Sequence, residues 1–176
     1  IGPDCVVNKK EFLSEIEYLQ KNGFNTNLIK ISPKCHVIQE EHVLEDNNFY
    51  VKTQGSTGKG VAPCIRNKYA RIGQRVIDSE NIEFFKPYIW DEKLYGNILC
   101  EGSQGFWIDI NYGNYPYVTS STTLPYSACS LGFSTHVINK IYGAAKMYDT
   151  RSGIDPLFPD SLLEDKELKY IGELGK

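Results

Sequence analysis

The sequence predicts an α/β protein in which a mostly parallel or mixed central sheet is flanked by helices. Short apolar runs typical of strands alternate along the chain with segments whose apolar residues recur at helical spacing. Glycines close several of these segments, as expected for the ends of helices and strands. The chain has 176 residues, about the length of one domain, and we expect residues 1–176 to form a single α/β domain.

The first helix is expected to begin after Asn8, an N-cap residue with Glu11 placed to close a capping box. Apolar residues then recur at helical spacing, and Gly23 ends the run. The sequences LIKIS (residues 28–32) and HVI (residues 36–38) indicate two short strands that follow this helix.

The second half of the chain is expected to continue the alternation. Residues 80–96 indicate a short helical region that is interrupted by its proline. Residues 97–102 indicate a buried strand that ends in glycine, and residues 106–110 indicate the next strand. A helix with a hydroxyl cap and a glycine stop is expected over residues 134–143, and residues 144–151 indicate a returning strand.

The composition excludes several classes of protein. The net charge of −3 at pH 7 gives no overall attraction to nucleic acid or to acidic membranes. No apolar run approaches the roughly 18 residues that a membrane-spanning helix needs, and no signal peptide is visible. The five cysteines are scattered and form no CxxC pair, which favours a reduced, cytoplasmic protein without a zinc site.

The stretch QGSTGKGVAPCIRNKYARIG (residues 54–73) suits an anion. It is not a P-loop, since Thr53 stands where that motif needs its first glycine and Gly60 stands where it needs a hydroxyl. Consecutive N–H groups in a glycine-rich turn can still form a concave anion site, with Thr57 as a further donor. A helix that begins near Pro63 would point its positive end at the same anion. The alternative is a flexible surface loop followed by a solvated basic helix.

A second donor-rich segment, CEGSQGFWIDINYGNYPYVTSSTT, covers residues 100–123 and begins at the end of the expected buried strand. Proteins of the α/β class place ligands at the ends of such strands. Gln104 offers both a donor and an acceptor, which suits the carbonyl or amide edge of a heterocycle. Residues 119–123 are five consecutive hydroxyl residues, which alone would indicate only a polar turn. Together the two segments favour a phosphorylated small molecule as the ligand.

The motifs GSTGKGVAP, KYAR, EGSQG, YPYVTSS and KMYDTRSG follow one another in an order that resembles the adenylosuccinate synthetase family. The resemblance runs from about Val6 to Lys176 and so covers nearly the whole chain. It implies a P-loop-NTPase-like α/β fold and a ligase that joins L-aspartate to IMP with GTP and Mg²⁺, giving adenylosuccinate. In that reaction the purine 6-oxygen is first phosphorylated, and the amine of aspartate then displaces the phosphate.

The resemblance also implies roles for particular residues. Thr57 in the glycine turn and Thr119 would hold the 5′-phosphate of IMP, and Gln104 would contact the 6-oxygen as a catalytic residue. Arg71 would reach across a homodimer interface to the nucleotide phosphate of the partner subunit. The segment that contains Ser152 would lie beside the ribose. The full implied set of substrate nucleotide-binding residues is Thr57, Gly58, Arg71, Gln104, Thr119 and Ser152.

We expect the chain to be the central portion of a longer enzyme and to be inactive alone. It starts at Ile1 in an apolar stretch and stops at YIGELGK, which has no terminal character. The family's glycine loop, with its catalytic aspartate, lysine and magnesium ligand, and its catalytic histidine are expected before Ile1. Its arginine-rich loop for aspartate and GTP is expected after the last residue. His36, His42 and His136 do not match the catalytic histidine and are expected to be structural.

Two other functions stay open. The family pattern TRVG.GPFPTE is replaced here by TRSGIDPLFPD, so that Ser152 stands where the family has an apolar residue beside the sugar. The segment between Arg75 and Cys100 is also short, as in compact members of the family. These departures leave open the related viral enzyme that uses dGMP, toward 2-aminoadenine DNA, and ATP stays open in place of GTP. The second alternative is a nucleotide-binding protein that has lost catalysis.

Overall fold

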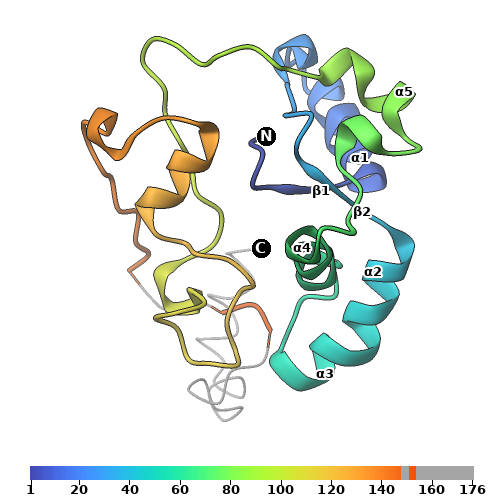
Figure 1. Cartoon of the computed structure of the whole chain (residues 1–176), viewed down its shortest axis with the longest axis vertical. Coiled ribbons are helices and arrows are strands. Elements are labelled where there is room, and N and C mark those ends of the chain that lie inside the picture. Colours follow the sequence, from blue (N-terminus) through green and yellow to red (C-terminus); the bar gives the residue numbers. More distant parts are fainter. Residues whose placement is uncertain (148–150, 154–176) are drawn as a thin grey trace.

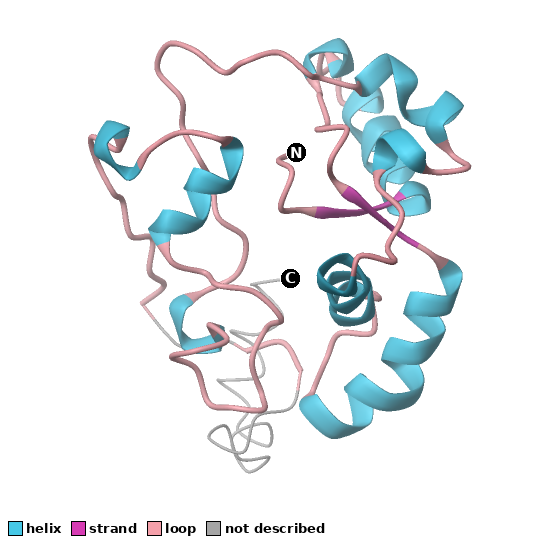
Figure 2. Ribbon diagram, in the orientation of Figure 1, coloured by secondary structure: helices cyan, strands magenta, loops and turns pink. Residues whose placement is uncertain are grey.

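The computed structural model describes residues 1–147 and 151–153. In this part of the chain, strands β1 (Val6–Asn8) and β2 (His36–Ile38) pair in parallel, with Val7 opposite Val37. Figure 2 shows helices gathered around the strand pair, with loops and short helices forming a second group of residues beside them. The α/β class is confirmed, and the HVI strand lies at the expected residues.

Helix α1 (Lys9–Lys21) follows β1 directly because Asn8 caps it. The Asn8 Oδ1 atom accepts hydrogen bonds from the backbone N–H groups of the second and third helical residues, at 2.9 and 3.2 Å. Gly23 has φ 79° just beyond the helix, where a left-handed residue ends it. The expected cap and stop are confirmed. Glu11, expected to close a capping box, instead forms an ion pair with Lys59.

A continuous helical segment connects β2 to the glycine-rich stretch (Figure 1). It consists of α2 (Glu40–Glu45), a π-helical turn (Asp46–Tyr50) and α3 (Val51–Gln54), which follow one another without a break. Gly55, with φ 65°, ends the segment in the left-handed region. Helix α4 (Val61–Ala70) begins after the next turn and packs against α2.

Helix α5 (Ile82–Phe85) and the 3₁₀ turn Lys86–Tyr88 pack against α1 through aromatic rings. The ring centroid of Phe12 lies 5.9 Å from that of Phe85 and 5.1 Å from that of Tyr88. The short helical region interrupted by proline is thus confirmed. Two more 3₁₀ turns, Thr26–Leu28 and Val76–Asp78, connect the elements. The core that these elements enclose consists of Val7, Phe12, Ile16, Ile31, Cys35, Val37, Val76 and Phe85.

The described residues after Trp90 contain little regular structure. They form three 3₁₀ helices, Phe106–Ile108, Pro125–Leu131 and Thr135–Val137, which are joined by loops. None of the buried apolar residues of the core comes from this part of the chain. Figure 1 shows the group in yellow and orange, connected to α5 by a long yellow-green link.

Several expected elements of this second half are wrong. Residues 97–102 and 106–110 do not form strands, and residues 134–143 contain only one 3₁₀ turn in place of the expected helix. Residues 144–147 of the last expected strand are also not in a strand, and residues 148–150 lie outside the described part of the chain.

The physical reason is that a strand needs a neighbouring strand to pair with. The run at residues 97–102 has none among the described residues, and the run at residues 106–110 forms only isolated backbone hydrogen bonds with Thr119 and Ser121. Ile98 and Leu99 expose 41% and 86% of their surfaces, so this apolar run is not buried. The LIKIS strand is likewise reduced to Ile31, which forms an isolated parallel bridge with Ile89. An apolar run shows that a segment could form a strand. Whether the strand forms depends on a second strand with which it can pair.

Candidate functional site

The glycine turn, defined here as residues Gly55–Gly60, connects α3 to α4 and has backbone geometry that requires glycine. Gly55, Gly58 and Gly60 have φ values of 65°, 73° and 78°, in the left-handed region. A Cβ atom on Gly60 would lie 2.9 Å from Ile38 Cγ2 and 3.0 Å from Val43 N. The turn therefore lies directly against β2 and α2, at a distance that leaves no room for a side chain.

The hydrogen bonds of the turn leave only some of its backbone donors for a ligand. The Gly60 N–H donates to Asp46 Oδ2 at 2.6 Å, so the N-terminal end of α4 already faces a carboxylate. The N–H groups of Thr57 and Lys59 have no acceptor among the described residues. The consecutive N–H groups expected to bind an anion are thus not all available, and the N–H groups of Thr57 and Lys59 are among those that are free within the described residues.

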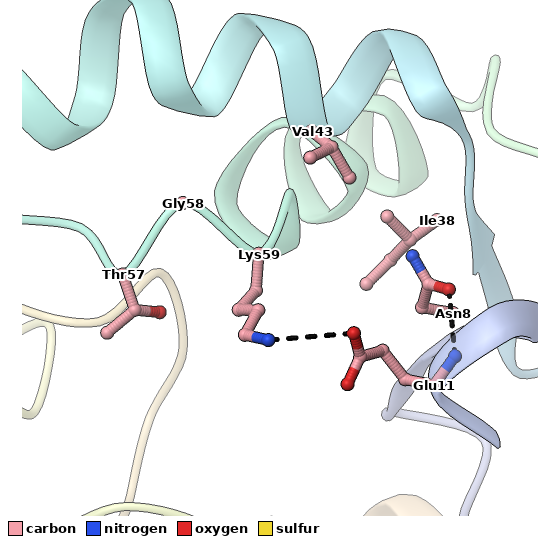
Figure 3. Close-up of a pocket in the computed structure, with 7 residues that line it drawn as sticks. All are labelled: Asn8, Glu11, Ile38, Val43, Thr57, Gly58 and Lys59. Carbon is pink, nitrogen blue, oxygen red and sulfur yellow. Dashed lines mark hydrogen bonds and ion pairs between the residues drawn. The ribbon is translucent and has the colours of Figure 1, made fainter. Parts of the chain in front are cut away.

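A pocket of about 440 Å³ opens beside the turn. Figure 3 shows Thr57 at the edge of this pocket and the Lys59 side chain directed at Glu11. Lys59 Nζ lies 3.6 Å from Glu11 Oε1, and both side chains are mostly exposed. An exposed ion pair of this kind contributes little stability, so the Lys59 ammonium can exchange Glu11 for an entering anion. The residues that line the pocket are Asn8, Glu11, Ile38, Val43, Thr57, Gly58 and Lys59.

The second candidate segment is organised by Asp109, which the sequence placed only as a strand residue. Its buried carboxylate accepts hydrogen bonds from the N–H groups of Thr123 (2.6 Å) and Asn111 (2.8 Å) and from the Thr122 hydroxyl (3.1 Å). These bonds, led by the one from Thr123, hold the pKa of Asp109 below its ordinary value. The carboxylate therefore closes the loop that carries Thr119. An aspartate two residues before Asn-Tyr-Gly is an Asx-turn signal that could have revealed it.

Three segments that are far apart in the sequence meet at one place. Arg151 Nη2 donates to the carbonyl oxygen of Tyr117 at 2.8 Å, so the residues 151–153 lie against the YPYVTSS motif. Gly153 has φ 87°, and a Cβ atom on it would overlap the carbonyl oxygen of Gly55 at the start of the glycine turn. Figure 1 shows residues 151–153, in red, between the end of α3 and the yellow loops. Residues 151–153 therefore contact both the glycine turn and the YPYVTSS motif.

Four of the predicted site residues belong to these neighbouring segments. Thr57 and Gly58 lie in the glycine turn, with Thr57 exposed and Gly58 buried. Thr119 is half-buried, and its N–H donates to the Ile108 carbonyl oxygen at 2.8 Å, which holds its backbone in place. Ser152 is exposed and lies between the two residues that make the contacts just described.

Gln104 and Arg71, the other two predicted site residues, share an unusual backbone. Their φ values are 71° and 64°, and they are the non-glycine residues with positive φ in the described part of the chain. A side chain in this region costs about 1–2 kcal/mol, and such residues gather at functional sites. Both side chains are exposed, and neither forms a hydrogen bond or ion pair with a described residue. Within the described residues, no hydrogen bond or ion pair connects the Gln104 side chain to the glycine turn.

Arg71 also differs from the other cations of the basic run at residues 66–75. Within the described residues it has no carboxylate partner, whereas the other three cations of the run do. Those pairs are Arg66 with Glu45, Lys68 with Asp4, and Arg75 with Asp78. Arg71 therefore keeps its charge available for an external anion.

The three histidines occupy different environments. His42 is buried, its Nδ1 accepts the Gln39 N–H at 3.0 Å, and its Nε2 lies 2.9 Å from Asn67 Nδ2. His36 is buried in β2, and His136 is exposed. These positions fit the structural role that we expect for the histidines.

No three His, Cys, Asp or Glu side chains of the described residues lie close enough together to hold a metal ion. These residues therefore do not fit a magnesium site. All five cysteines are unpaired, and burial raises the pKa of Cys35 to about 12 and that of Cys64 to about 11, so neither supplies a thiolate at neutral pH. None of the described helices combines the length and apolar character needed to cross a membrane.

Comparison with known proteins identifies the family. The family model described as adenylosuccinate synthetase matches residues 1–94 and 88–176, which together cover the whole chain. The chain belongs to the adenylosuccinate synthetase family. The resemblance found in the sequence motifs is confirmed, and so is the adenylosuccinate synthetase fold that it implied.

Several adenylosuccinate synthetases are similar along almost all of the chain. The one from Malacoplasma penetrans (strain HF-2) is 31% identical over 226 residues, covering 99% of this chain and 53% of the relative. The one from Thermodesulfovibrio yellowstonii is 34% identical over 230 residues, covering 99% of this chain and 54% of the relative. The chain thus spans about half the length of the curated relatives it matches. A structure of fully ligated adenylosuccinate synthetase from Plasmodium falciparum has a TM-score of 0.68 at 23% identity, covering 88% of this chain and 48% of that chain, and it shows the shared fold.

The link after α5 is shorter than in these adenylosuccinate synthetases. The aligned stretch of the M. penetrans relative has 226 residues, whereas this chain has 176. The two ranges matched by the family model overlap at residues 88–94, which places the difference near this point. The short segment noted between Arg75 and Cys100 is therefore a feature of this member of the family.

Proposed function

We propose that this chain is the central, nucleotide-holding part of a ligase that joins L-aspartate to IMP, with GTP as co-substrate, and forms adenylosuccinate. Family membership supports the reaction class. The observation that carries the nucleotide site is the meeting of the glycine turn with the YPYVTSS motif and residues 151–153. The resemblance assigns these three segments to the binding of one nucleotide. They lie together in the structure although they are far apart in the sequence.

The 5′-phosphate of the nucleotide would lie at the glycine turn. The free N–H groups of Thr57 and Lys59 and the Thr57 hydroxyl are donors for its oxygens. The Lys59 ammonium adds a positive charge at the same pocket once it leaves Glu11. Thr119 would approach from the neighbouring loop, which the Asp109 carboxylate holds closed.

Gln104 would act on the purine. The purine N1 loses its proton to a base outside this chain, the terminal phosphoryl group of GTP moves to the 6-oxygen and GDP leaves. The aspartate amine then attacks C6, so that phosphate departs and the amine nitrogen loses a proton. The side-chain amide of Gln104 would donate to the 6-oxygen as it gains negative charge. This requires the exposed loop around Gln104 to turn inward, and its flanking residues Gly102 and Gly105 have open space around them.

The assembly and the remaining parts of the reaction extend beyond the described residues. We propose a homodimer in which the unpaired Arg71 serves the partner subunit's nucleotide phosphate, and we place the protein in the cytoplasm, which its unpaired cysteines favour. Magnesium ligands and the catalytic aspartate belong to segments outside this chain.

Steady-state kinetics of the complete protein would test the reaction. Formation of adenylosuccinate from IMP, aspartate and GTP is the expected result, and ATP is the matched alternative donor. Turnover with dGMP but not IMP would assign the protein to the viral type of reaction. Nucleotide binding without turnover of either would show that catalysis has been lost.

The variant Thr57→Val would test the phosphate site. Loss of one hydrogen bond to a charged group is expected to raise the KM for IMP by about 5- to 30-fold, which corresponds to about 1–2 kcal/mol. Thr53→Val is the matched control, since the Thr53 hydroxyl donates to the Phe49 carbonyl oxygen at 2.9 Å on the exposed face of α3. A raised KM for GTP with an unchanged KM for IMP would overturn the assignment.

A further inference from the structure

The glycine turn is held from behind by two consecutive residues of the π-helical turn, Asp46 and Asn47, which we call the clamp. Asp46 Oδ2 accepts the Gly60 N–H at 2.6 Å. Asn47 Nδ2 donates to the Gly58 carbonyl oxygen at 2.9 Å. Each clamp residue therefore fixes one of the two glycines that flank Lys59, and both glycines have positive φ.

The contact between Asn47 and Gly58 is close. A Cβ atom on Gly58 would lie 2.6 Å from Asn47 Oδ1, so glycine is needed for Asn47 to approach. Asn47 Nδ2 also donates to the Val43 carbonyl oxygen at 2.8 Å. Because both of its partners are carbonyl oxygens, which only accept, the orientation of the Asn47 amide is fixed.

The π-helical turn explains why two consecutive side chains can reach the same short turn. In an α-helix, neighbouring side chains point about 100° apart. A π-helical turn, which is closed by i→i+5 hydrogen bonds, interrupts this regular progression, and such turns occur frequently at functional sites. Here the interruption begins at Asp46, at the residues that bond the glycine turn.

Stability alone gives a poor reason for an aspartate at position 46. The residue is fully buried, and its Oδ1 atom has no hydrogen-bond partner within the described residues. A buried carboxylate with one unsatisfied oxygen costs stability. An asparagine could accept the Gly60 N–H without burying a charge. The charged acceptor does, however, hold that N–H more firmly than a neutral one would.

We propose that Asp46 and Asn47 are positioning residues for the nucleotide phosphate. By fixing Gly60 and Gly58 they direct the free N–H groups of Thr57 and Lys59 into the pocket, where the 5′-phosphate binds. Since the Gly60 N–H is taken by the clamp, the phosphate is held by Thr57 and Lys59, the residues on either side of the clamped Gly58. This inference rests on the nucleotide site proposed above.

The test compares four variants of the complete protein. Asp46→Ala removes the acceptor, Asp46→Asn keeps an oxygen, and Asn47→Ala removes the donor. Asn48→Ala is the matched control, because Asn48 is exposed on the same π-helical turn and bonds to no described residue. IMP binding is measured by titration calorimetry, and the KM values for IMP, GTP and aspartate are measured separately.

We expect Asp46→Ala to weaken IMP binding by about tenfold or more and Asn47→Ala by about fivefold, as for the loss of one hydrogen bond each. Asp46→Asn should recover most of the affinity, and Asn48→Ala should bind as the unchanged protein does. The KM values for GTP and aspartate should stay constant, whereas a distortion of the whole active site would raise them as well.

The proposal is overturned if Asp46→Ala and Asn47→Ala bind IMP normally, or if the KM values for all three substrates rise together. If Asp46→Ala does not fold, the result for Asn47→Ala decides the matter in the same way. If the unchanged protein binds neither IMP nor dGMP, the proposed function fails and the clamp role fails with it. Normal binding by the variants, beside clear binding by the unchanged protein, refutes the clamp role alone.

Discussion

An alanine at position 153 is expected to disturb the nucleotide site through a single added carbon atom. Gly153 has φ 87°, a conformation that costs an alanine about 1–2 kcal/mol. The new Cβ would overlap the Gly55 carbonyl oxygen and lie 3.0 Å from the Gly55 carbonyl carbon. Non-bonded heavy atoms pack at about 3.5–4.0 Å, and the overlap with the oxygen is the tighter contact, so the two segments must separate by about 1 Å or more. A misplacement of about 1 Å can lower an enzymatic rate by about 10²-fold.

The assay is kcat/KM of the complete protein for its nucleotide, with Gly132→Ala as the matched control. Gly132 has φ 97°, and an added Cβ would meet no atom within 4 Å, so alanine there carries the backbone cost without the overlap. We expect Gly153→Ala to lower kcat/KM by about 10- to 100-fold and Gly132→Ala to lower only thermal stability. Equal kcat/KM values in the two variants would refute the contact between residues 153 and 55 as a part of the working site.

Three further outcomes are expected. Burial lowers the pKa of His36 and His42 below the ordinary value of 6.5. As the pH falls, the unfolded chain therefore takes up these protons before the folded chain does. The free energy of unfolding should thus decrease as the pH drops below about 6.5. Urea unfolding across this range would show it, and His42→Gln should weaken the dependence; a slope that the substitution leaves unchanged would contradict the assignment. Gln104→Ala should lower kcat by up to about 10²-fold with little change in nucleotide KM, whereas a change in KM alone would reduce Gln104 to a binding contact. Mixing Arg71→Leu with Gln104→Ala, each of low activity alone, should raise the activity above that of either variant, since one site of the mixed dimer has neither lesion. No recovery after subunit exchange would place Arg71 outside the partner's site.

The features that could be predicted from the sequence depend on neighbouring residues. Asn8 caps α1 because its side chain needs only the next three N–H groups, and these follow in the sequence whatever the rest of the fold does. The glycine turn is equally local, since Gly58 and Gly60 adopt left-handed backbone that other residues avoid. The motif order was also sufficient to identify the family.

The features that could not be predicted depend on partners distant in the sequence. Asp46 lies in a polar stretch that reads as an exposed helix face, and only the fold brings the Gly60 N–H to its carboxylate. Asp109 reads as the polar residue of a strand, yet it bonds to residues more than ten positions away. The strand expected around Leu99 failed for the same reason, because its own residues do not contain the edge with which it would pair.

The shortened link gives the chain a point of attack for proteases. Residues 90–107 are all exposed, and Lys93 lies among them. Trypsin does not cut at Lys86, which Pro87 follows, and the next lysine or arginine after Lys93 is Lys140. A first cut at Lys93 would therefore separate the peptide that carries the glycine turn from the peptide that carries Thr119. If a nucleotide binds to both peptides, the cleaved protein should elute as one species in gel filtration while the nucleotide is bound. When the nucleotide is removed, the two peptides should dissociate.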